Sequence, residues 1–379
     1  MARPPGNEQV TQALARVQDP EIHRPITELD MVKDIDISRD GVVRVGVWLT
    51  IAGCPLRETI TRDVSTEVGK VPGVTDVRVE LDVMSEEQRK ELQNKLRGGK
   101  QTREIPFAQP GSLTRVYAVA SGKGGVGKSS VTVNLAAALA AMGRKVGVVD
   151  ADIYGHSVPR MLGVTGKPTQ VEDMIMPPSA RGVQVISIGM FTSHNAPVVW
   201  RGPMLHRAVQ QFLSDVYWGD LDVLLMDLPP GTGDVAISVA QLVPSAEILV
   251  VTTPQPAAAE VAARAGAVAL QTHQQVVGVI ENMSWLPCPH CGERVEVFGS
   301  GGGKAVANAL SKAIGTDVPL LSEIPIDVRL REGGDSGDPL VLSDPDTSAA
   351  KELRALAERL DGRGRGLVGR QLGLSVAAH

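Results

Sequence analysis

A glycine-rich stretch carries the residue types that hold phosphate groups. Gly122, Gly127, Lys128 and Ser129 match the spacing G-x-x-x-x-G-K-[ST] of a phosphate-binding loop. The glycines let backbone N–H groups turn toward an anion, the lysine can reach the β- and γ-phosphates, and the serine hydroxyl can bind Mg²⁺. An apolar run precedes the loop and a helical pattern follows it, which is the required context. We therefore expect a nucleotide site formed by Gly122, Lys123, Gly124, Gly125, Val126, Gly127, Lys128, Ser129 and Ser130.

Two apolar runs end in carboxylates. One run reaches Asp150 and is followed by Asp152, and another ends at Asp227 before a proline- and glycine-rich segment, residues 229–234. A carboxylate after a buried strand is costly unless it has a charged partner, and Mg²⁺ is such a partner. We expect Asp227 to hold Mg²⁺ through water together with Ser129, residues 229–234 to sense the γ-phosphate, and Asp152 to orient or deprotonate the attacking water.

Three cysteines form the other chemical signal. Cys288 and Cys291 stand in a C-x-x-C turn with a proline and a glycine, and two thiolates fill half of a tetrahedral site. Two subunits would supply four thiolates, which suits zinc or a [4Fe–4S] cluster. Cys54 lies before Pro55, a residue that favours the first position of a helix. From chemistry alone it is either a reactive or metal-binding thiol or a small buried hydrophobic side chain.

Composition limits the classes of protein. The chain has 379 residues, 43% of them apolar and 21% charged, with a net charge of −5 and 3% aromatic residues. These values indicate a globular protein with no overall attraction to nucleic acid and few side chains for stacking bases. No apolar run approaches the length of a membrane span, and the odd number of cysteines argues against a disulfide framework. We expect a cytoplasmic protein that binds neither nucleic acid nor membrane.

Periodicity predicts two folded parts. Residues 1–84 form a small α+β domain, with a helix at 8–17, strands at 31–37, 42–50 and 77–83, and a helix between the last two strands. A charged helix and a linker follow at 85–112. Residues 113–362 alternate strands with helices, which predicts an α/β domain with a mostly parallel, doubly wound sheet. Residues 363–379 are rich in glycine, so we expect a disordered tail rather than a membrane-anchoring helix.

A second glycine-rich run, Gly299–Lys304, is not another phosphate loop, because its spacing differs and Ala305 replaces the Mg²⁺-binding hydroxyl.

The sequence of the loop resembles the deviant Walker A group of P-loop ATPases, which includes MinD, ParA and the nitrogenase iron protein. Their K-G-G-x-G-K-[ST] pattern is present from Lys123 to Ser129. Within that group, Asp150-x-Asp152 and the D-x-P-P-G-T-G-D run ending at Asp234 resemble the Mrp/ApbC iron–sulfur carrier ATPases. The resemblance implies that Lys123 reaches the nucleotide of a second subunit. It also implies that Asn282 reads adenine, so ATP is favoured over GTP, and that Cys288 and Cys291 hold a bridging cluster.

The N-terminal part, residues 8–84, resembles the SufT-like iron–sulfur assembly domain. The resemblance rests on Asp19-Pro20-Glu21, Glu28-Leu29 and Thr50-x-x-Gly53-Cys54-Pro55. It implies that Cys54 takes part in cluster handling.

These observations favour a slow, Mg²⁺-dependent ATPase that carries a [4Fe–4S] cluster as a homodimer, receives it from an assembly scaffold and delivers it to apo-proteins. Three alternatives stay open. The first is a MinD/ParA-like, ATP-dependent dimerisation switch with a structural zinc site. A switch of this kind explains the phosphate loop and both aspartates, but its switching role gives no reason for the cysteine pair. A redox enzyme would take its two cysteines from separate segments. A zinc-bridged dimer with no role in iron chemistry is the third.

Overall fold

The structure is a computed structural model that describes residues 4–20, 22, 24–50, 57–96, 104–109, 111–152, 155, 157–172, 174–191, 202–231, 234–255, 269–272 and 274–363. The chain divides into two compact units. The first takes in residues 1–103 and 169–176, and the second takes in residues 104–168 and 177–379.

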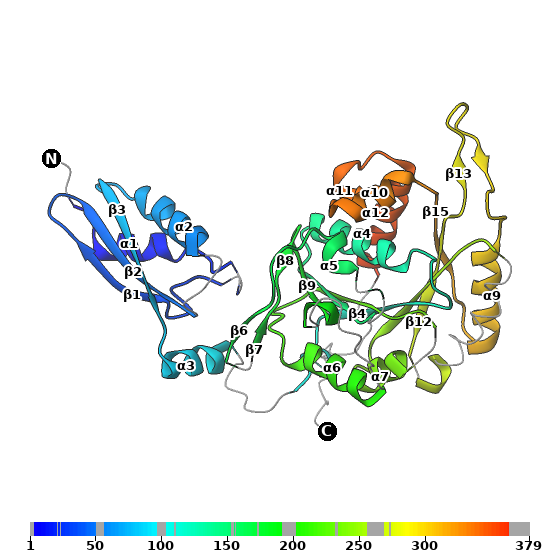
Figure 1. The fold of residues 1–379 in the computed structure, drawn as a ribbon, viewed down its shortest axis with the longest axis horizontal. Helices are drawn as coiled ribbons and strands as arrows, with labels where there is room; N and C mark the ends of the chain where they lie inside the picture. Colours follow the sequence, from blue (N-terminus) through cyan, green and yellow to red (C-terminus); the bar gives the residue numbers. More distant parts are fainter. Residues whose placement is uncertain are drawn as a thin grey trace, which may run out of the picture. The chain divides into compact units, whose positions relative to one another are not determined.

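The first unit is built on a three-stranded sheet. Its elements are α1 (Asn7–Leu14), β1 (Val32–Ile37), β2 (Val42–Leu49), α2 (Arg57–Gly69), β3 (Asp76–Val83) and α3 (Glu86–Leu96) (Figure 1). Strands β1 and β2 pair antiparallel, while β2 and β3 pair in parallel. A parallel pair needs a crossover between its strands, and α2 supplies it.

The core of this unit combines two periodicities. Alternate residues of β2 and every fourth residue of α2 are buried, which brings together Val43, Val45, Val47, Ile60, Val64 and Val68. The hairpin of β6 (Thr169–Val171) and β7 (Met174–Met176) belongs to this unit although it lies far along the chain. Arg89 on α3 reaches it, with Nε 3.1 Å from Glu172 Oε1.

The second unit contains an eight-stranded sheet in the order β15-β12-β11-β4-β10-β5-β9-β8. Every neighbouring pair is parallel except β8 and β9. Most of its strands are buried along almost their whole length, as expected for a parallel sheet covered on both faces. The strands are β4 (Arg115–Ser121), β5 (Val146–Asp150), β8 (Ser179–Ala180), β9 (Val183–Ser187), β10 (Val223–Asp227), β11 (Glu247–Thr252), β12 (Val276–Asn282) and β15 (Leu320–Ile324).

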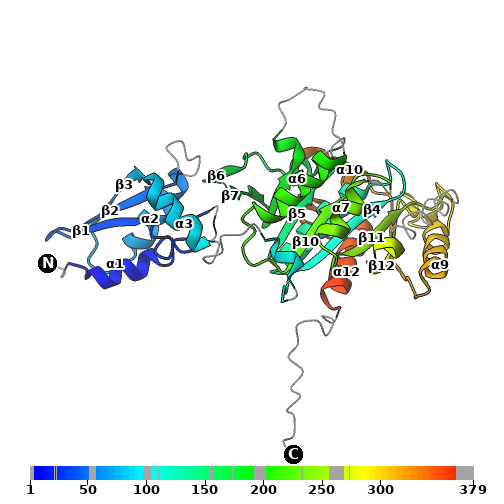
Figure 2. The same ribbon diagram turned by 90° about the horizontal axis from the view of Figure 1, so that it is seen from below.

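Helices cover both faces of this sheet (Figures 1 and 2). On one face lie α4 (Lys128–Ala141), α5 (Val158–Met161), α10 (Val328–Ser336), α11 (Leu340–Ser343) and α12 (Ser348–Asp361). On the other lie α6 (Gly202–Ser214) and α7 (Asp234–Leu242), and α9 (Gly302–Ile314) packs against β12 and β15. Single short turns of 3₁₀-helix occur at η1 (Pro106–Ala108) and η2 (Ile188–Met190).

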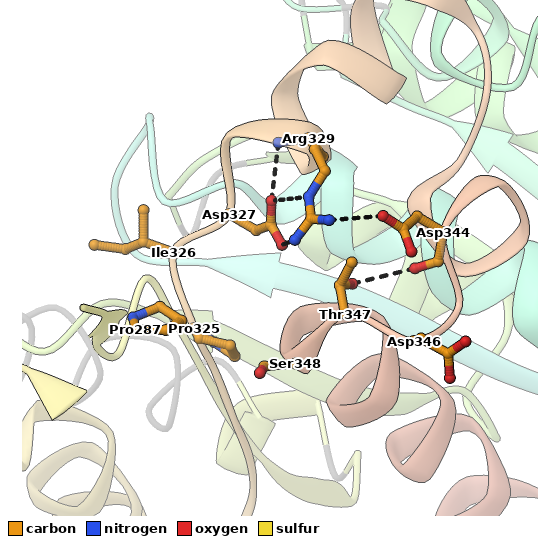
Figure 3. Close-up of a pocket in the computed structure, with 9 residues that line it drawn as sticks. All are labelled: Pro287, Pro325, Ile326, Asp327, Arg329, Asp344, Asp346, Thr347 and Ser348. Atoms are coloured by element: carbon orange, nitrogen blue, oxygen red, sulfur yellow. Dashed lines mark hydrogen bonds and ion pairs between the residues drawn. The ribbon is translucent and has the colours of Figure 1, made fainter. Parts of the chain in front are cut away.

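A pocket of about 360 Å³ lies where β15 leads into α10 (Figure 3). Its wall combines apolar side chains with ionised ones, of which Arg329 binds both Asp327 and Asp344. The lining residues are Pro287, Pro325, Ile326, Asp327, Arg329, Asp344, Asp346, Thr347 and Ser348.

The expected fold, a P-loop domain with a mostly parallel sheet preceded by a small α+β domain, is confirmed. The helix expected after the phosphate loop already starts at Lys128, within the G-K-[ST] part of the motif. The reason is that Gly127, in the left-handed conformation (φ 77°), already caps the helix. The short strands β6, β7 and β8 were not foreseen, because two or three residues leave no measurable alternation.

Candidate functional site

The phosphate loop connects β4 to α4 in an open conformation. Gly125 (φ 80°) and Gly127 (φ 77°) both occupy the left-handed region that favours glycine. A Cβ atom added at Gly125 would meet nothing within 4 Å. The loop is thus exposed at Gly124 and Gly125 and leads into the start of a helix, whose positive end attracts anions.

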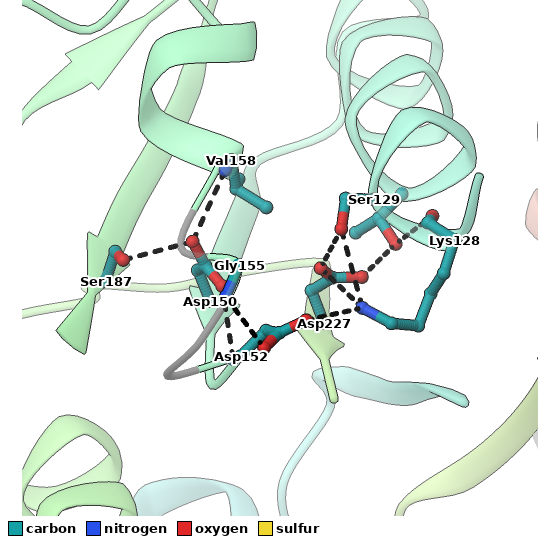
Figure 4. A network of polar contacts seen from close by, with 9 residues as sticks. Lys128, Ser129, Asp150, Asp152, Gly155, Val158, Ser187 and Asp227 are labelled. Carbon is teal, nitrogen blue, oxygen red and sulfur yellow. Dashed lines mark hydrogen bonds and ion pairs between the residues drawn. The ribbon is translucent and has the colours of Figure 1, made fainter. Parts of the chain in front are cut away.

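Lys128 and Asp227 form a buried ion pair at the foot of the loop (Figure 4). Lys128 Nζ lies 2.7 Å from Asp227 Oδ2, and their side chains are 6% and 0% exposed. The same ammonium lies 4.0 Å from Asp152 Oδ2. Lys128 thus provides the cation that a buried carboxylate at this strand end requires.

Two hydroxyl groups of α4 complete the surroundings of Asp227. Ser129 Oγ donates to Asp227 Oδ2 at 2.6 Å, and Thr132 Oγ1 lies 2.8 Å from Asp227 Oδ1. The two residues predicted to bind Mg²⁺, Ser129 and Asp227, are therefore in direct contact. A hydroxyl and a carboxylate meeting below an open phosphate loop fit a hard cation with oxygen ligands. Thr132 was missed by sequence reasoning, although its place four residues after Lys128 puts both on the same side of the helix.

Asp150 lies beside Asp227, since the two residues are register partners on the neighbouring strands β5 and β10. Its carboxylate accepts hydrogen bonds from Ser187 Oγ (3.0 Å), the Asp152 N–H (3.2 Å) and the Val158 N–H (3.3 Å). Burial, followed by the charge of Asp227, raises the pKa of Asp150 to about 7.

Asp152 stands at the start of the loop that follows β5. Its Oδ1 accepts a hydrogen bond from the Gly155 N–H at 3.0 Å, while Oδ2 faces Lys128. The side chain is 13% exposed. Asp152 is thus hydrogen-bonded at Oδ1 and faces Lys128 with Oδ2, close to the predicted position of the phosphates. The role expected for it there remains a prediction.

Lys123, the second lysine of the loop, does not join this group. Its Nζ lies 2.6 Å from the side-chain oxygen of Gln255, which also accepts a hydrogen bond from Thr253 Oγ1 at 2.7 Å. In the single chain, Lys123 is therefore held at the end of β11 rather than beside Asp227. Its predicted action on a second subunit remains a prediction.

Asn282, at the end of β12, is directed at the backbone of the phosphate loop. Its Nδ2 donates to the carbonyl oxygen of Val126 at 2.9 Å, and the residue is 2% exposed. A Cβ atom at Gly127 would approach Nδ2 to 2.2 Å, so the glycine permits this close packing. The amide supports the loop in this structure, and reading of adenine by Asn282 stays a prediction.

The C-x-x-C motif forms the turn of a short hairpin between β13 (Leu286–Pro287) and β14 (Arg294–Val295). The Gly292 N–H donates to the Cys288 carbonyl at 2.8 Å, and the Cys288 N–H donates to the Glu293 carbonyl at 2.9 Å. The backbone N–H groups of Cys291 and then His290 lower the pKa of the Cys288 thiol below its ordinary value. Cys291 is exposed and Cys288 is half-buried. The turn thus favours a thiolate that a soft metal could reach.

Some predicted residues lie outside the described ranges. These are Glu21, Gly53, Cys54 and Pro55 of the N-terminal motifs, Thr232 and Gly233 of the segment expected to sense the γ-phosphate, and residues 364–379 of the expected disordered tail. Within the described ranges, no three His, Cys, Asp or Glu side chains converge as metal ligands would. Of the helices in the described ranges, none combines the length and apolarity needed to cross a bilayer.

Comparison with known proteins agrees with this geometry. Residues 112–361 match the ParA family, described as NUBPL iron-transfer P-loop NTPase, and residues 7–81 match a family described as iron-sulfur cluster assembly protein. A relative named iron-sulfur cluster carrier protein from Mycobacterium tuberculosis is 65% identical over 368 residues, covering 97% of this chain and 96% of the relative. One of the same name from Deinococcus radiodurans is 44% identical over 359 residues, covering 94% and 95%.

A solved structure extends the comparison to three dimensions. A nucleotide-binding protein from Archaeoglobus fulgidus, in complex with ADP, is 36% identical with a TM-score of 0.53, covering 63% of this chain and 92% of that one. Both resemblances noted in the sequence, to the deviant Walker A carriers and to the assembly domain, are thereby confirmed. The chain belongs to the family of iron-transfer P-loop NTPases, with an iron–sulfur cluster assembly domain at its N-terminal end.

Proposed function

We propose that this protein hydrolyses ATP and carries a [4Fe–4S] cluster, which it holds between two subunits and delivers to apo-proteins. The observation that carries the proposal is the position of β12. Its last residue, Asn282, is bonded to the phosphate loop at Val126, and the cysteine hairpin follows directly along the chain. A shift of the loop on nucleotide binding can therefore reach the thiols through one hydrogen bond and the short stretch of chain from Asn282 to Cys288.

The ATPase part of the proposal rests on the group around Asp227. Lys128, now paired with Asp227, would turn toward the β- and γ-phosphates, while Ser129 and Asp227 would hold Mg²⁺. Bound Mg²⁺ supplies neutralisation of phosphate charge. Asp152, fixed at the edge of the same group, would orient or deprotonate the attacking water.

The base of the nucleotide would enter the pocket beside α10. Its volume of about 360 Å³ lies within the range of small-molecule sites. Pro325 and Ile326 follow β15, whose last residue pairs with Asn282, so the pocket lies at the same strand-end edge as the phosphate loop. Helices α10 and α11, which border it, pack on α4. The apolar side chains suit the faces of a base, and the carboxylates suit an exocyclic amino group.

The cluster is the cargo, and its proposed ligands are Cys288 and Cys291. Two thiolates per chain fill half of the positions of a [4Fe–4S] cluster, so two subunits complete it. The lowered pKa of Cys288 favours the ligating form at neutral pH. The relatives from Mycobacterium tuberculosis and Deinococcus radiodurans are named iron-sulfur cluster carrier proteins, which supports iron rather than zinc. Cys54 of the assembly domain would serve a separate handling step.

The homodimer would receive its cluster from an assembly scaffold and act in the cytoplasm, without nucleic acid or membrane as a partner. A dimerisation switch with structural zinc at the same cysteines is the alternative. It shares the ATP site but predicts a different metal.

Anaerobic purification followed by iron, sulfide and zinc analysis tests the proposal. We expect about four iron and four sulfide per dimer, because the four thiolates come from two chains. The Cys288→Ala protein should lose the cluster while keeping its fold and nucleotide binding, since Cys288 is not among the residues that line the proposed base pocket and its backbone hydrogen bonds stay within the hairpin. Cys54→Ala should keep the bridging cluster but transfer it more slowly to an apo-acceptor.

Stoichiometric zinc without sulfide would favour the switch. Four iron per monomer, or a stable cluster in the Cys288→Ala protein, would contradict the bridging arrangement. Equal cluster loss in Cys54→Ala would place Cys54 among the ligands.

A further inference from the structure

The two oxygens of the Asp227 carboxylate have different neighbours. Oδ2 faces the loop, where Ser129 Oγ (2.6 Å) and Lys128 Nζ (2.7 Å) approach it. Oδ1 faces the body of α4, where the hydroxyl of Thr132 lies 2.8 Å away. Asp227 is completely buried, so water does not compensate for a lost partner at either oxygen.

Thr132 is buried as completely as Asp227 and has two acceptors within reach. Its Oγ1 lies 2.8 Å from Asp227 Oδ1 and 3.0 Å from the Lys128 carbonyl oxygen one turn earlier. A hydroxyl has one proton, and an ionised carboxylate is a stronger acceptor than a carbonyl that already belongs to a helix. The Thr132 proton is therefore directed at Asp227.

We infer that Thr132 is a positioning residue for Asp227. By holding Oδ1, it prevents the carboxylate from rotating about its Cβ–Cγ bond, so that Oδ2 stays directed at Ser129. This is the oxygen that meets the hydroxyl of the proposed Mg²⁺ site. The inference rests on the proposed function in one respect, namely that Asp227 serves Mg²⁺.

Loss of the hydroxyl has a defined consequence. Without it, Oδ1 is buried and unpartnered, a state that is more costly for a carboxylate than for a neutral polar group. Rotation toward Lys128 and Ser129 relieves that cost but moves Oδ2 away from its present position. The affinity for Mg²⁺ in the presence of nucleotide then falls, while contacts between the loop and the phosphates remain.

The experiment is a Mg²⁺ titration of the nucleotide-bound protein, read as the melting temperature at saturating ADP. Thr132→Val removes the hydroxyl and keeps the shape, and we expect the Mg²⁺ concentration at half-effect to rise on the order of tenfold. Thr132→Ser keeps the hydroxyl and should stay within about twofold of wild type. ADP binding without Mg²⁺ should not change in either variant.

A matched control separates this role from a general effect on helix stability. Thr61 on α2 makes the same bond to a carbonyl one turn earlier (Thr61 Oγ1 to Arg57 O, 2.8 Å). Thr61→Val should leave the Mg²⁺ titration unchanged. If Thr132→Val does not fold, Thr132→Ala removes the same hydroxyl and is titrated instead.

An unchanged Mg²⁺ requirement in Thr132→Val, or an equal rise in Thr132→Ser, overturns the inference. The control for the proposed function is Asp227→Ala. If Asp227→Ala loses the Mg²⁺ effect and Thr132→Val does not shift it, the positioning role fails alone. If Asp227→Ala titrates like wild type, the proposed metal role of Asp227 fails.

Discussion

Two glycine-rich helix starts in this protein look alike in sequence but differ in what occupies them. Helix α4 is capped by Gly127 and helix α9 by Gly301, each with φ 77°. At α9, the buried Glu281 carboxylate accepts a hydrogen bond from the Gly303 N–H. Gly302 and Gly303 are small there because Pro254 and Glu281 lie against them. Open space beside a glycine does not separate the two starts, because a Cβ atom at Gly125 or at Gly301 would meet nothing within 4 Å.

The comparison shows that glycine and a helix N-terminus are not enough for a phosphate site. The positive end of α9 is neutralised by the chain's own carboxylate, whereas α4 is left for an external anion. Both arrangements depend on the end of β12. Adjacent residues of a strand point to opposite faces, so Glu281 supports α9 while Asn282 supports the phosphate loop. The cysteine hairpin lies between β12 and α9 along the chain.

The largest expected effect distinguishes the two helix starts directly. Lys128→Ala removes the phosphate cation, and Asp227→Ala removes the proposed metal carboxylate. Each should reduce ATP turnover by about two orders of magnitude or more. Asp152→Ala should spare binding but lose turnover. Lys304→Ala, the matched change at α9, should have no effect because that lysine is exposed beside a filled helix start. Steady-state phosphate release measures all four, and wild-type turnover in Lys128→Ala would exclude the loop as the nucleotide site.

The second prediction concerns Lys123, which has no counterpart before α9. Lys123→Ala should retain binding of MgATP because Lys128 remains, yet lose ATP-induced tightening of the dimer. The test mixes Lys123→Ala with Asp152→Ala subunits. If Lys123 acts on the partner's nucleotide, one site of the mixed dimer has a complete set of residues and turnover returns. If the lysine acts within its own chain, both sites are defective and the mixture stays inactive.

Much of this architecture could be predicted because its signals are local. The phosphate loop follows a fixed spacing, and the strands ending at Asp150, Asp227 and Asn282 are continuous apolar runs closed by a polar residue. Thr132, Gln255 and Glu281 carry no comparable signal. Thr132 meets a residue 95 positions away, and Lys123 meets one 132 positions away. Such contacts depend on how β10, β11 and β12 line up with the loop, which no short pattern records.

The third prediction separates two roles of Asn282. If Asn282 supports the phosphate loop, Asn282→Ala should weaken ATP and GTP equally, by roughly tenfold, the value of one lost hydrogen bond. If Asn282 reads adenine, the affinity for ATP should fall and that for GTP should not. Equilibrium binding of both nucleotides decides between these roles. Glu281→Gln is the control at α9: it should lower the melting temperature by about 2–4 °C and leave both affinities unchanged.

The smallest expected effect is a pH dependence at the strand end beside the loop. Burial and then the neighbouring Asp227 raise the pKa of Asp150 to about 7, well above its ordinary value of 3.8. Between these values the folded chain keeps a proton that the unfolded chain releases, so the contribution of Asp150 to stability is lost as pH rises through this window.

The variant Asp150→Asn removes the titration. We therefore expect the melting temperature of Asp150→Asn without nucleotide, relative to that of wild type, to rise by a few degrees from about pH 5 to pH 8. Ser187→Ala, which deletes a hydrogen bond that favours the charged form, should move the transition to higher pH. If the melting temperatures of wild type and Asp150→Asn change with pH in the same way across this range, Asp150 is ionised throughout. Lys128 and the three hydrogen bonds would then offset its burial.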